Sequence, residues 1–420
     1  MELLLFINLV KNILMKNCFL FLLLIFSLFT ICSCAGDGEN KGAPEGHTTA
    51  EITPIPQSIS DVNVNLYVEN SGSMFGYLNG TSFRNNINYF MNGFCHTNLC
   101  QDTNIHCFYI NSKAWARPSV RVTDFISNLK TNATSCGTHS STDIALIFDT
   151  IFARTDNKTL SVLVSDMILS PDGSNAANYL TDMNIKIMQK IKSKSKDFAT
   201  IIFHCEAPFK GAYYDCDNHL RSIDTIRPYY ICVIGNNSLI KRFLSEMPNF
   251  PHFNKLNYSV FFSYDSNYKG KYFLVTCIKG NRTSPTSVKN AKLDGNSNEF
   301  TMQLGVDFSE LLVEDSYLTN VNNYQLSNPN YKLTSIQRKS TGNSTHVLCL
   351  ETTNPVHQTA LTISLKNQAI PVWISNLNNE DCNRIFNDLD KTYGIEKIID
   401  GIYNGYKSDD YYAKMTININ

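Results

Sequence analysis

Five oxygen-bearing side chains, in three short segments of the chain, could together hold a divalent cation. None of them is Cys or His, so the set lacks the ligands that zinc and copper favour. Mg²⁺ prefers hydroxyl and carboxylate oxygens, which it arranges as an octahedron at about 2.0–2.1 Å. Two carboxylates would leave the loaded site roughly neutral, with a coordination position open to a carboxylate from outside. The five residues are Glu69, Ser71, Ser73, Thr142 and Asp166.

Two predicted strands and one predicted helix must bring these residues together. Apolar residues alternate over 62–68, and a nearly continuous apolar run over 160–165 is typical of a buried strand. Glu69 and Asp166 directly follow these two strands. The cap-rich stretch Ser140–Asp143 predicts the start of a helix. If the two strands are neighbours in a sheet, their loops open onto one crevice at the carboxyl ends of the strands.

The pattern of elements divides the chain into two domains. Strand and helix signals alternate over 59–250, which predicts an α/β domain with a doubly wound, mostly parallel sheet and helices on both faces. Short strand signals over 251–420 predict a β-rich, sandwich-like second domain. A helical segment from Asp381 to Tyr406 is expected to pack on one of the two domains. Further strands are expected at 105–110, 198–203 and 229–234, and helical faces at 83–94, 144–152, 180–191 and 238–247.

The first 34 residues have the pattern of a lipoprotein signal peptide. An apolar run from Phe19 to Ile31 follows Lys16 and is short for a membrane span. The sequence Ile31-Cys32-Ser33-Cys34 resembles the lipobox of bacterial lipoproteins, in which acyl chains such as palmitate are attached to the cysteine, here Cys34. A plain signal peptide or an anchor helix is the alternative. Residues 35–58 are expected to be a flexible tether, so the mature protein would be lipid-anchored in the cell envelope and face the periplasm or the cell exterior.

Charge and cysteine content limit the classes of partner. The formal net charge is −1 and the charges are dispersed, which argues against nucleic-acid binding. Most of the 13 cysteines follow the signal segment, and in an oxidising compartment some of them are expected to pair. Cys95 and Cys100 are close enough for a local bridge. Cys205, Cys232 and Cys277 lie in apolar runs and are expected to be buried thiols.

The three oxygen-bearing segments resemble the metal-ion-dependent adhesion site of von Willebrand factor type A (vWA) domains. That family's pattern is Asp-x-Ser-x-Ser in one loop, Thr in a second and Asp in a third. Glu69-Asn70-Ser71-Gly72-Ser73 is similar to the first loop, STDIALIF around Thr142 to the second, and VLVSDM around Asp166 to the third. The resemblance covers roughly residues 61–247. It implies a Rossmann-like α/β fold, Mg²⁺ or Mn²⁺ as the bound ion, and a protein or peptide partner whose Asp or Glu completes the octahedron.

One residue departs from the family pattern. Glu69 stands where the family has Asp, a residue that usually holds the metal through water. The longer Glu69 side chain could bind the metal directly, push the ion outward or hydrogen-bond to the serines. The motif residues also have structural interpretations, because Asn-Ser-Gly-Ser is ordinary turn chemistry and Thr142 and Asp143 could simply cap a helix.

The predicted function is a membrane-anchored, extracytoplasmic binding module that captures an acidic group of a protein through its cation. The sequence has no Gly-x-Ser-x-Gly elbow and no glycine-rich phosphate loop with its lysine, so an enzyme is not favoured. Two alternatives stay open. One is a hydrolase of phosphoesterase type that uses the same cation. The other is an envelope assembly scaffold that needs the fold but no metal.

Overall fold

The computed structural model describes residues 62–420, except 112, 130–135, 137–142, 172–175, 218, 267 and 356–358. Residues 58–420 form one compact unit. The predicted signal peptide (1–34), the tether (35–58), Cys34 and Thr142 therefore lie outside the described residues. Among the helices of the described part, none has the length and apolar character that crossing a membrane requires.

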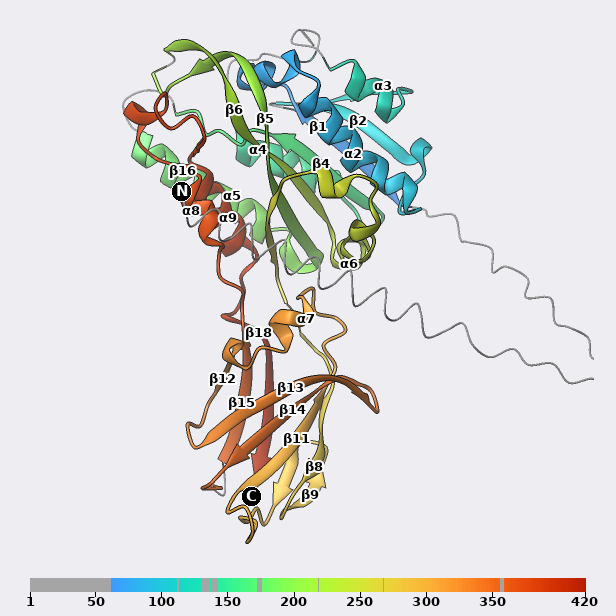
Figure 1. The fold of residues 1–420 in the computed structure, drawn as a ribbon, viewed down its shortest axis with the longest axis vertical. Coiled ribbons are helices and arrows are strands. Elements are labelled where there is room, and N and C mark those ends of the chain that lie inside the picture. Colours follow the sequence, from blue (N-terminus) through green and yellow to red (C-terminus); the bar gives the residue numbers. More distant parts are fainter. Residues whose placement is uncertain are drawn as a thin grey trace, which may run out of the picture. The chain divides into compact units, whose positions relative to one another are not determined.

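A mixed seven-stranded sheet forms the core of the α/β part (Figure 1). Its strand order is β3-β2-β1-β4-β6-β5-β7. β2, β1 and β4 are parallel, and the remaining pairings in the sheet are antiparallel. This confirms the predicted α/β class. The sheet is mixed and not mostly parallel as expected, because parallel pairing is confined to β2, β1 and β4 and the outer strands are joined by antiparallel pairings. The strands are β1 (Asn63–Glu69), β2 (Ile105–Ile110), β3 (Ala114–Arg117), β4 (Thr159–Ser165), β5 (Phe198–Tyr214), β6 (Leu220–Asn236) and β7 (Ser259–Tyr264).

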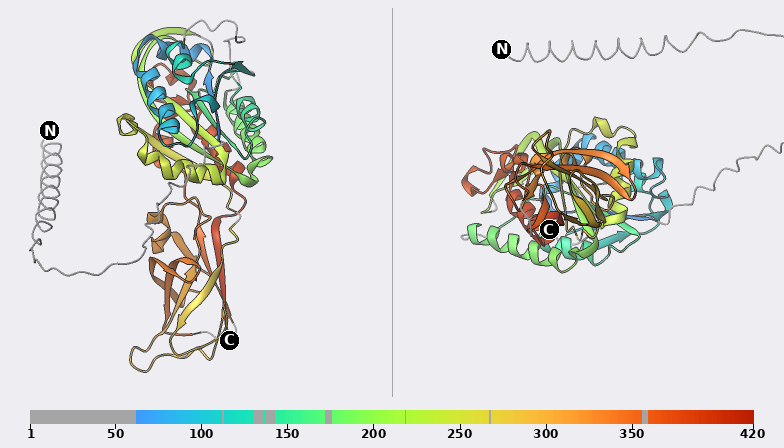
Figure 2. Two further views of the ribbon diagram at one scale, coloured as in Figure 1. Left: turned by 90° about the vertical axis from the view of Figure 1, so that its right-hand side faces the viewer. Right: turned by 90° about the horizontal axis from the view of Figure 1, so that it is seen from below.

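Helices cover both faces of this sheet (Figure 2). On β5, Phe203 packs against Phe90 of α2 and Phe243 of α6, whereas the Thr200 hydroxyl lies 2.8 Å from the Tyr406 hydroxyl of α9. Residues three apart on a strand point to opposite faces, so α2 and α6 lie on one face and α9 on the other. The helices are α2 (Ser82–His96), α3 (Val122–Ser127), α4 (Ile144–Phe152), α5 (Ala176–Lys192), α6 (Asn237–Glu246) and α9 (Ile395–Tyr406).

The α/β part also includes segments beyond residue 250. β7 pairs with β5 as the outer strand of the seven-stranded sheet. α9 packs closely on α5. The two helices are so near that a Cβ added to Gly401 or Gly405 would meet backbone carbonyls of α5 at 2.8–3.0 Å. The expected helix from Asp381 to Tyr406 is in fact a 3-10 turn at Cys382–Arg384, the short strand β17 (Thr392–Tyr393) and then α9.

Two further sheets form a β-sandwich. Their orders are β12-β15-β18-β10-β9 and β13-β14-β11-β8. A Cβ on Gly280 would meet Val288 of the first sheet and Phe300 of the second, so the inner faces share one apolar core. The strands of the sandwich are β8 (Tyr272–Cys277), β9 (Asn281–Ser284), β10 (Ser287–Lys289), β11 (Phe300–Val306), β12 (Tyr324–Leu326), β13 (Tyr331–Thr341), β14 (Ser344–Thr352), β15 (Thr359–Lys366) and β18 (Tyr411–Ile419). Three other short elements beyond residue 300 are α7 (Asp315–Leu318), α8 (Val372–Asn376) and β16 (Asn378–Asn379), and β16 pairs with β17 in a separate two-stranded sheet.

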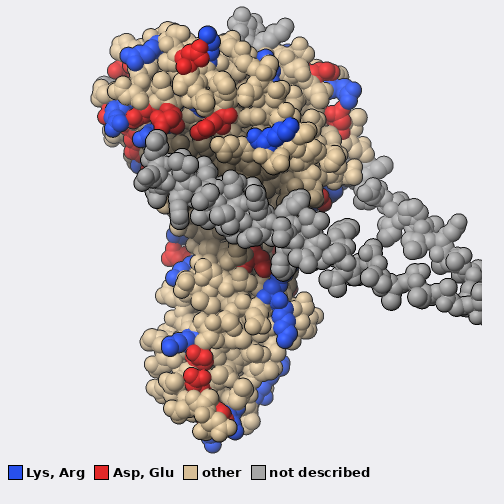
Figure 3. All heavy atoms as spheres, viewed as in Figure 1, with Lys and Arg blue, Asp and Glu red and all other residues tan. Residues whose placement is uncertain are grey.

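One disulfide, Cys216–Cys382, joins segments that are 166 residues apart in the chain. Cys95 and Cys100 are free thiols, so the local bridge expected there is not formed. Cys205 and Cys232 are buried as expected, and Cys277 is partly exposed. On the surface, acidic and basic side chains are interspersed over the face shown in Figure 3, which agrees with the dispersed charges of the sequence.

Candidate functional site

Four of the five predicted site residues lie at the carboxyl ends of β1 and β4. These two strands are direct parallel neighbours, and Val68 is paired with Val164. Glu69 and Ser165 therefore stand side by side at the end of their strands, and the following loops carry Ser71, Ser73 and Asp166. Thr142 lies outside the described residues. The described chain near it resumes at Asp143, whose carboxylate accepts a hydrogen bond from Leu146 N (3.1 Å) and caps α4.

Glu69 is joined to the loop after β4. Its side chain is 4% exposed, and Oε2 accepts a hydrogen bond from the Ser165 hydroxyl. Ser165 Oγ in turn accepts a hydrogen bond of 2.8 Å from Met167 N. Met167 has a positive φ of 50°, a conformation that is uncommon for a residue with a side chain. The Glu69 carboxylate therefore supports a sharp turn that places the residue between Ser165 and Met167, which is Asp166.

Ser71 and Ser73 point to the same place. Ser71 is extended and immediately precedes η1 (Gly72–Asn79), a 3-10 helix. Its Oγ lies 3.0 Å from Ser73 Oγ. That distance suits a hydrogen bond, and it also equals the separation of about 3.0 Å between adjacent octahedral ligands that are each about 2.1 Å from one cation. The two hydroxyls are thus already spaced as neighbouring ligands would be.

Asp166 is a buried carboxylate with an unused oxygen. It is 2% exposed, and Oδ1 accepts a hydrogen bond from Ile168 N at 3.3 Å. Oδ2 has no hydrogen-bond partner among the described residues. Burial raises the pKa of Asp166, while the nearby Ser73 hydroxyl and the Arg227 charge act in the opposite direction. Buried polar atoms are normally satisfied by a partner, so an oxygen in this state fits a missing ligand such as a cation.

Two asparagines that are not among the five predicted site residues hold a neighbouring segment. Asn70 Nδ2 and Asn111 Nδ2 both donate to the carbonyl oxygen of Cys136, at 3.3 and 2.9 Å. Asn70 and Asn111 follow the adjacent strands β1 and β2, and both are buried. The only sequence signal for them is their position, one after each strand. Their role is to fix Cys136, which precedes the segment that contains Thr142.

The hairpin formed by β5 and β6 continues past the carboxyl end of β4. Tyr230 is opposite Ser165, so residues 205–229, here called the hairpin extension, lie beyond the last pairing with β4. Phe209 of this extension packs on Gly76, where an added Cβ would overlap the aromatic ring. The Tyr77 hydroxyl donates to Pro228 O at 2.5 Å. The hairpin extension therefore covers η1, the element that carries Ser73.

The hairpin extension alternates like a strand in its sequence, but it also contains prolines and a glycine, which are uncommon inside strands. Buried and exposed residues alternate from Cys205 to Lys210 as expected for a strand. The predicted strands end at Phe203 and begin at Tyr229. Pro208, Gly211 and Pro228 lie in the part that the prediction leaves out. In the structure these residues are accommodated within two 17-residue strands.

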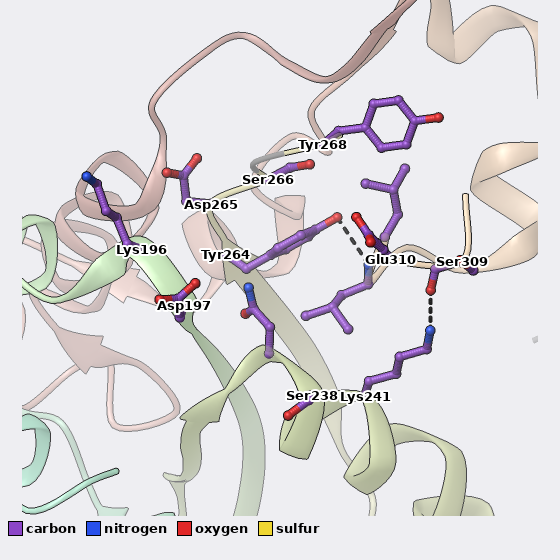
Figure 4. A pocket seen from close by; sticks show the side chains of 13 residues that line it. Lys196, Asp197, Ser238, Lys241, Tyr264, Asp265, Ser266, Tyr268, Ser309 and Glu310 are labelled. Atoms are coloured by element: carbon purple, nitrogen blue, oxygen red, sulfur yellow. Dashed lines mark hydrogen bonds between the residues drawn. The ribbon is translucent and has the colours of Figure 1, made fainter. Parts of the chain in front are cut away.

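Among the described residues, no three His, Cys, Asp or Glu side chains converge to form a metal cluster. The candidate site has two carboxylates, Glu69 and Asp166, and otherwise depends on hydroxyls. A separate hollow of about 420 Å³ lies away from this site, and Figure 4 shows its lining. In that hollow Lys241 donates to Ser309 O, and Leu312 N donates to the Tyr264 hydroxyl at 3.2 Å, so these polar groups are used within the protein.

No family model matches the chain, and neither a curated protein nor a solved structure shows significant similarity to it. Function must therefore be argued from the site itself.

Proposed function

We propose that this protein is a cation-dependent binding module that captures an acidic group of a protein partner. Mg²⁺ or Mn²⁺ would be held by Ser71, Ser73, Thr142 and Asp166, and a carboxylate of the partner would complete the octahedron. The observation that supports this most is the 3.0 Å spacing of Ser71 Oγ and Ser73 Oγ beside Asp166, whose buried Oδ2 has no hydrogen-bond partner among the described residues. Hydroxyl and carboxylate oxygens are the ligands that Mg²⁺ prefers.

The role of Glu69 in this proposal is to support the site from behind. Its hydrogen bond from Ser165 leads to the turn at Met167, and this favours a positioning role over direct ligation. Such a partner beyond the ligands orients them and is often as important as the ligands themselves. We also propose that the α/β part has a vWA-type fold. Three parallel strands, with the motifs at the carboxyl ends of β1 and β4, support this.

The location that we propose is the outer side of a membrane, with Cys34 as the lipidated residue. The Cys216–Cys382 disulfide supports an oxidising compartment. A lipid anchor at Cys34 and the tether 35–58 would leave the binding module free to reach its partner.

A metal-free scaffold in the envelope is a second candidate. It is favoured by the burial of Glu69 and Asp166, which are 4% and 2% exposed, because a buried carboxylate can also serve to hold a loop. No described contact favours the hydrolase alternative specifically.

Calorimetric titration of Mg²⁺ and Mn²⁺ into the full chain in mild detergent tests the proposal. We expect saturable binding that is lost in Asp166→Ala and weakened at least tenfold in Ser71→Ala. Asp182→Ala, which removes an exposed carboxylate on α5, is the matched control and should bind like the wild type. Absence of binding to wild-type protein at millimolar cation would refute the cation site and favour the scaffold.

A further inference from the structure

The hairpin extension brings a buried positive charge to the candidate site. Arg227 is fully buried and is the largest side chain in the protein's described core with that degree of burial. A charge that is removed from water is costly unless other groups compensate it. The groups around Arg227 must therefore compensate for the loss of water around its guanidinium.

Neutral groups hold the Arg227 guanidinium. Nη1 donates to Leu389 O at 2.7 Å, and Nη2 donates to the Tyr213 hydroxyl at 2.8 Å. The guanidinium carbon also lies 3.9 Å from the centre of the Tyr213 ring, a cation–π distance. Within the described part of the chain Arg227 forms no ion pair with an acid, and its Nε has no hydrogen-bond partner there. These contacts orient the group without cancelling its charge.

Asp166 is the acid that interacts electrostatically with the Arg227 guanidinium. Tyr230 is paired with Ser165, so Asp166 and the segment that contains Arg227 both continue past the same end of the sheet. Tyr77 of η1 bonds to Pro228, the residue after Arg227. Burial would lower the pKa of Arg227, but Tyr213, Tyr77 and Asp166 raise it, and the Arg227 charge acts on the pKa of Asp166 in turn. Asp166 and Arg227 are thus electrostatic neighbours, each with one buried atom that lacks a partner among the described residues.

We propose that Arg227 sets the charge of the candidate cation site: it opposes cation binding and strengthens the capture of an anionic ligand once the cation is bound. This inference rests on the proposed function. The carboxylates of Glu69 and Asp166 with the Arg227 guanidinium carry one net negative charge. A divalent cation converts this to one net positive charge, whereas the same site without Arg227 would become neutral. The loaded site therefore attracts a carboxylate, and the cation alone binds less tightly than it would in a site without Arg227.

The test compares variants that differ in charge at one position. Arg227→Gln removes the charge and keeps a hydrogen-bond donor, and Arg227→Lys keeps the charge. Mg²⁺ affinity is measured by calorimetry on the full chain in detergent. Acetate serves as the carboxylate probe, and relaxation of its methyl protons reports its binding to protein loaded with Mn²⁺. We expect Arg227→Gln to bind Mg²⁺ at least tenfold more tightly than wild type, because a charge that repels the cation has been removed from a low-dielectric site. The same variant should bind acetate at least tenfold more weakly, because that charge attracts the anion. Arg227→Lys should stay within about threefold of wild type in both.

The outcomes separate the two proposals. If wild-type protein binds Mg²⁺ and folded Arg227→Gln binds it no more tightly, the Arg227 inference is overturned and the proposed function stands. If wild-type protein binds no cation but Arg227→Gln does, the opposing role of Arg227 is supported and the proposed function fails. If neither binds, both are overturned.

A second variant covers the case in which Arg227→Gln does not fold. Replacing both charges, in Asp166→Asn/Arg227→Gln, no longer leaves Asp166 as an isolated buried carboxylate. In EDTA we expect this double variant to fold where Arg227→Gln does not, and to unfold at a higher temperature than Arg227→Gln where both fold. A double variant that is no more stable than Arg227→Gln would show that the two charges do not interact and would overturn the inference.

Discussion

Glu69 and Ser165 are hydrogen-bonded across the ends of two neighbouring parallel strands, and this bond connects the first and third loops of the candidate site. Ser165 Oγ donates to Glu69 and accepts from Met167 N, so one hydroxyl serves both the carboxylate and the turn after β4. An Asp at position 69 would be shorter by one methylene. The longer Glu can reach the hydroxyl on the adjacent strand, which gives a physical reason for a Glu at this position.

Replacing Glu69 by Ala should weaken the fold even without a cation. The change leaves the buried Ser165 hydroxyl without its acceptor, and an unsatisfied buried group costs about 1–3 kcal/mol. Urea unfolding in EDTA measures this loss. Glu206→Ala, which removes an exposed carboxylate on β5, is the control and should change the stability by less than about 0.5 kcal/mol. Equal stability of Glu69→Ala and wild type would show that the bond to Ser165 is dispensable.

Replacing Gly76 by Ala should disturb the contact between η1 and the hairpin extension. A Cβ at this position overlaps the Phe209 ring, so the ring or the hairpin must move. Overpacking of this kind costs about 1–3 kcal/mol, and the movement should also weaken Mg²⁺ binding because Ser73 lies on the same element. Denaturant unfolding and calorimetry check the two effects.

Gly80→Ala is the matched control for that experiment. It lies just after η1, and a Cβ there meets no atom within 4 Å. The control should retain the stability and the Mg²⁺ affinity of wild type. If Gly76→Ala behaves in the same way, the packing of Phe209 on η1 does not constrain the site.

His204 should make stability depend on pH. Burial lowers its pKa from 6.5 to about 4, and Nε2 has no hydrogen-bond partner among the described residues. Because the unfolded chain binds a proton at a higher pH than the folded one, the free energy of unfolding should fall as pH decreases from about 6.5 to about 4. The loss reaches about 3 kcal/mol at the lower end.

The His204→Leu variant isolates this contribution. Its stability should fall less steeply than that of wild type between those pH values, whereas His106→Leu, at an exposed position on β2, should keep the wild-type slope. Urea unfolding at several pH values provides the comparison. Identical slopes for His204→Leu and wild type would mean that His204 titrates normally in the folded protein.

Loss of the Cys216–Cys382 disulfide should destabilise the protein. The bridge ties the turn of the hairpin extension to a segment 166 residues away, and such bridges contribute about 2–4 kcal/mol, chiefly by restricting the unfolded chain. We expect Cys216→Ser to lose that amount and to become insensitive to a reducing agent. Cys95→Ser, at a free thiol, should keep both the stability and the reductant sensitivity of wild type. A wild-type protein that reductant does not destabilise would contradict the expectation.

The local periodicity of the sequence was sufficient to place β1, β2 and β4 and the main helices of the α/β part. Alternation over 62–68 and the apolar run over 160–165 reflect how a strand buries its side chains, and this depends on neighbours in the chain. The four described site residues could be found for the same reason, because each lies at or shortly after the end of one of these strands: Glu69 ends β1, Ser71 and Ser73 follow it, and Asp166 follows β4. That β1 and β4 are adjacent was an inference from the crevice that parallel strands form, and the structure confirms it.

Only the tertiary structure decided which distant segments complete the site. The Cys216–Cys382 bridge joins residues that no local pattern relates. The return of α9 to α5 depends on Gly401 and Gly405 fitting against backbone atoms of a helix about 200 residues earlier in the chain. In the sequence, Arg227 is simply an arginine that precedes an apolar run. Only the pairing of β6 with β4 places the segment that contains Arg227 at the same end of the sheet as Asp166. Burial and electrostatic coupling are properties of the assembled core, so a reading of neighbouring residues cannot supply them.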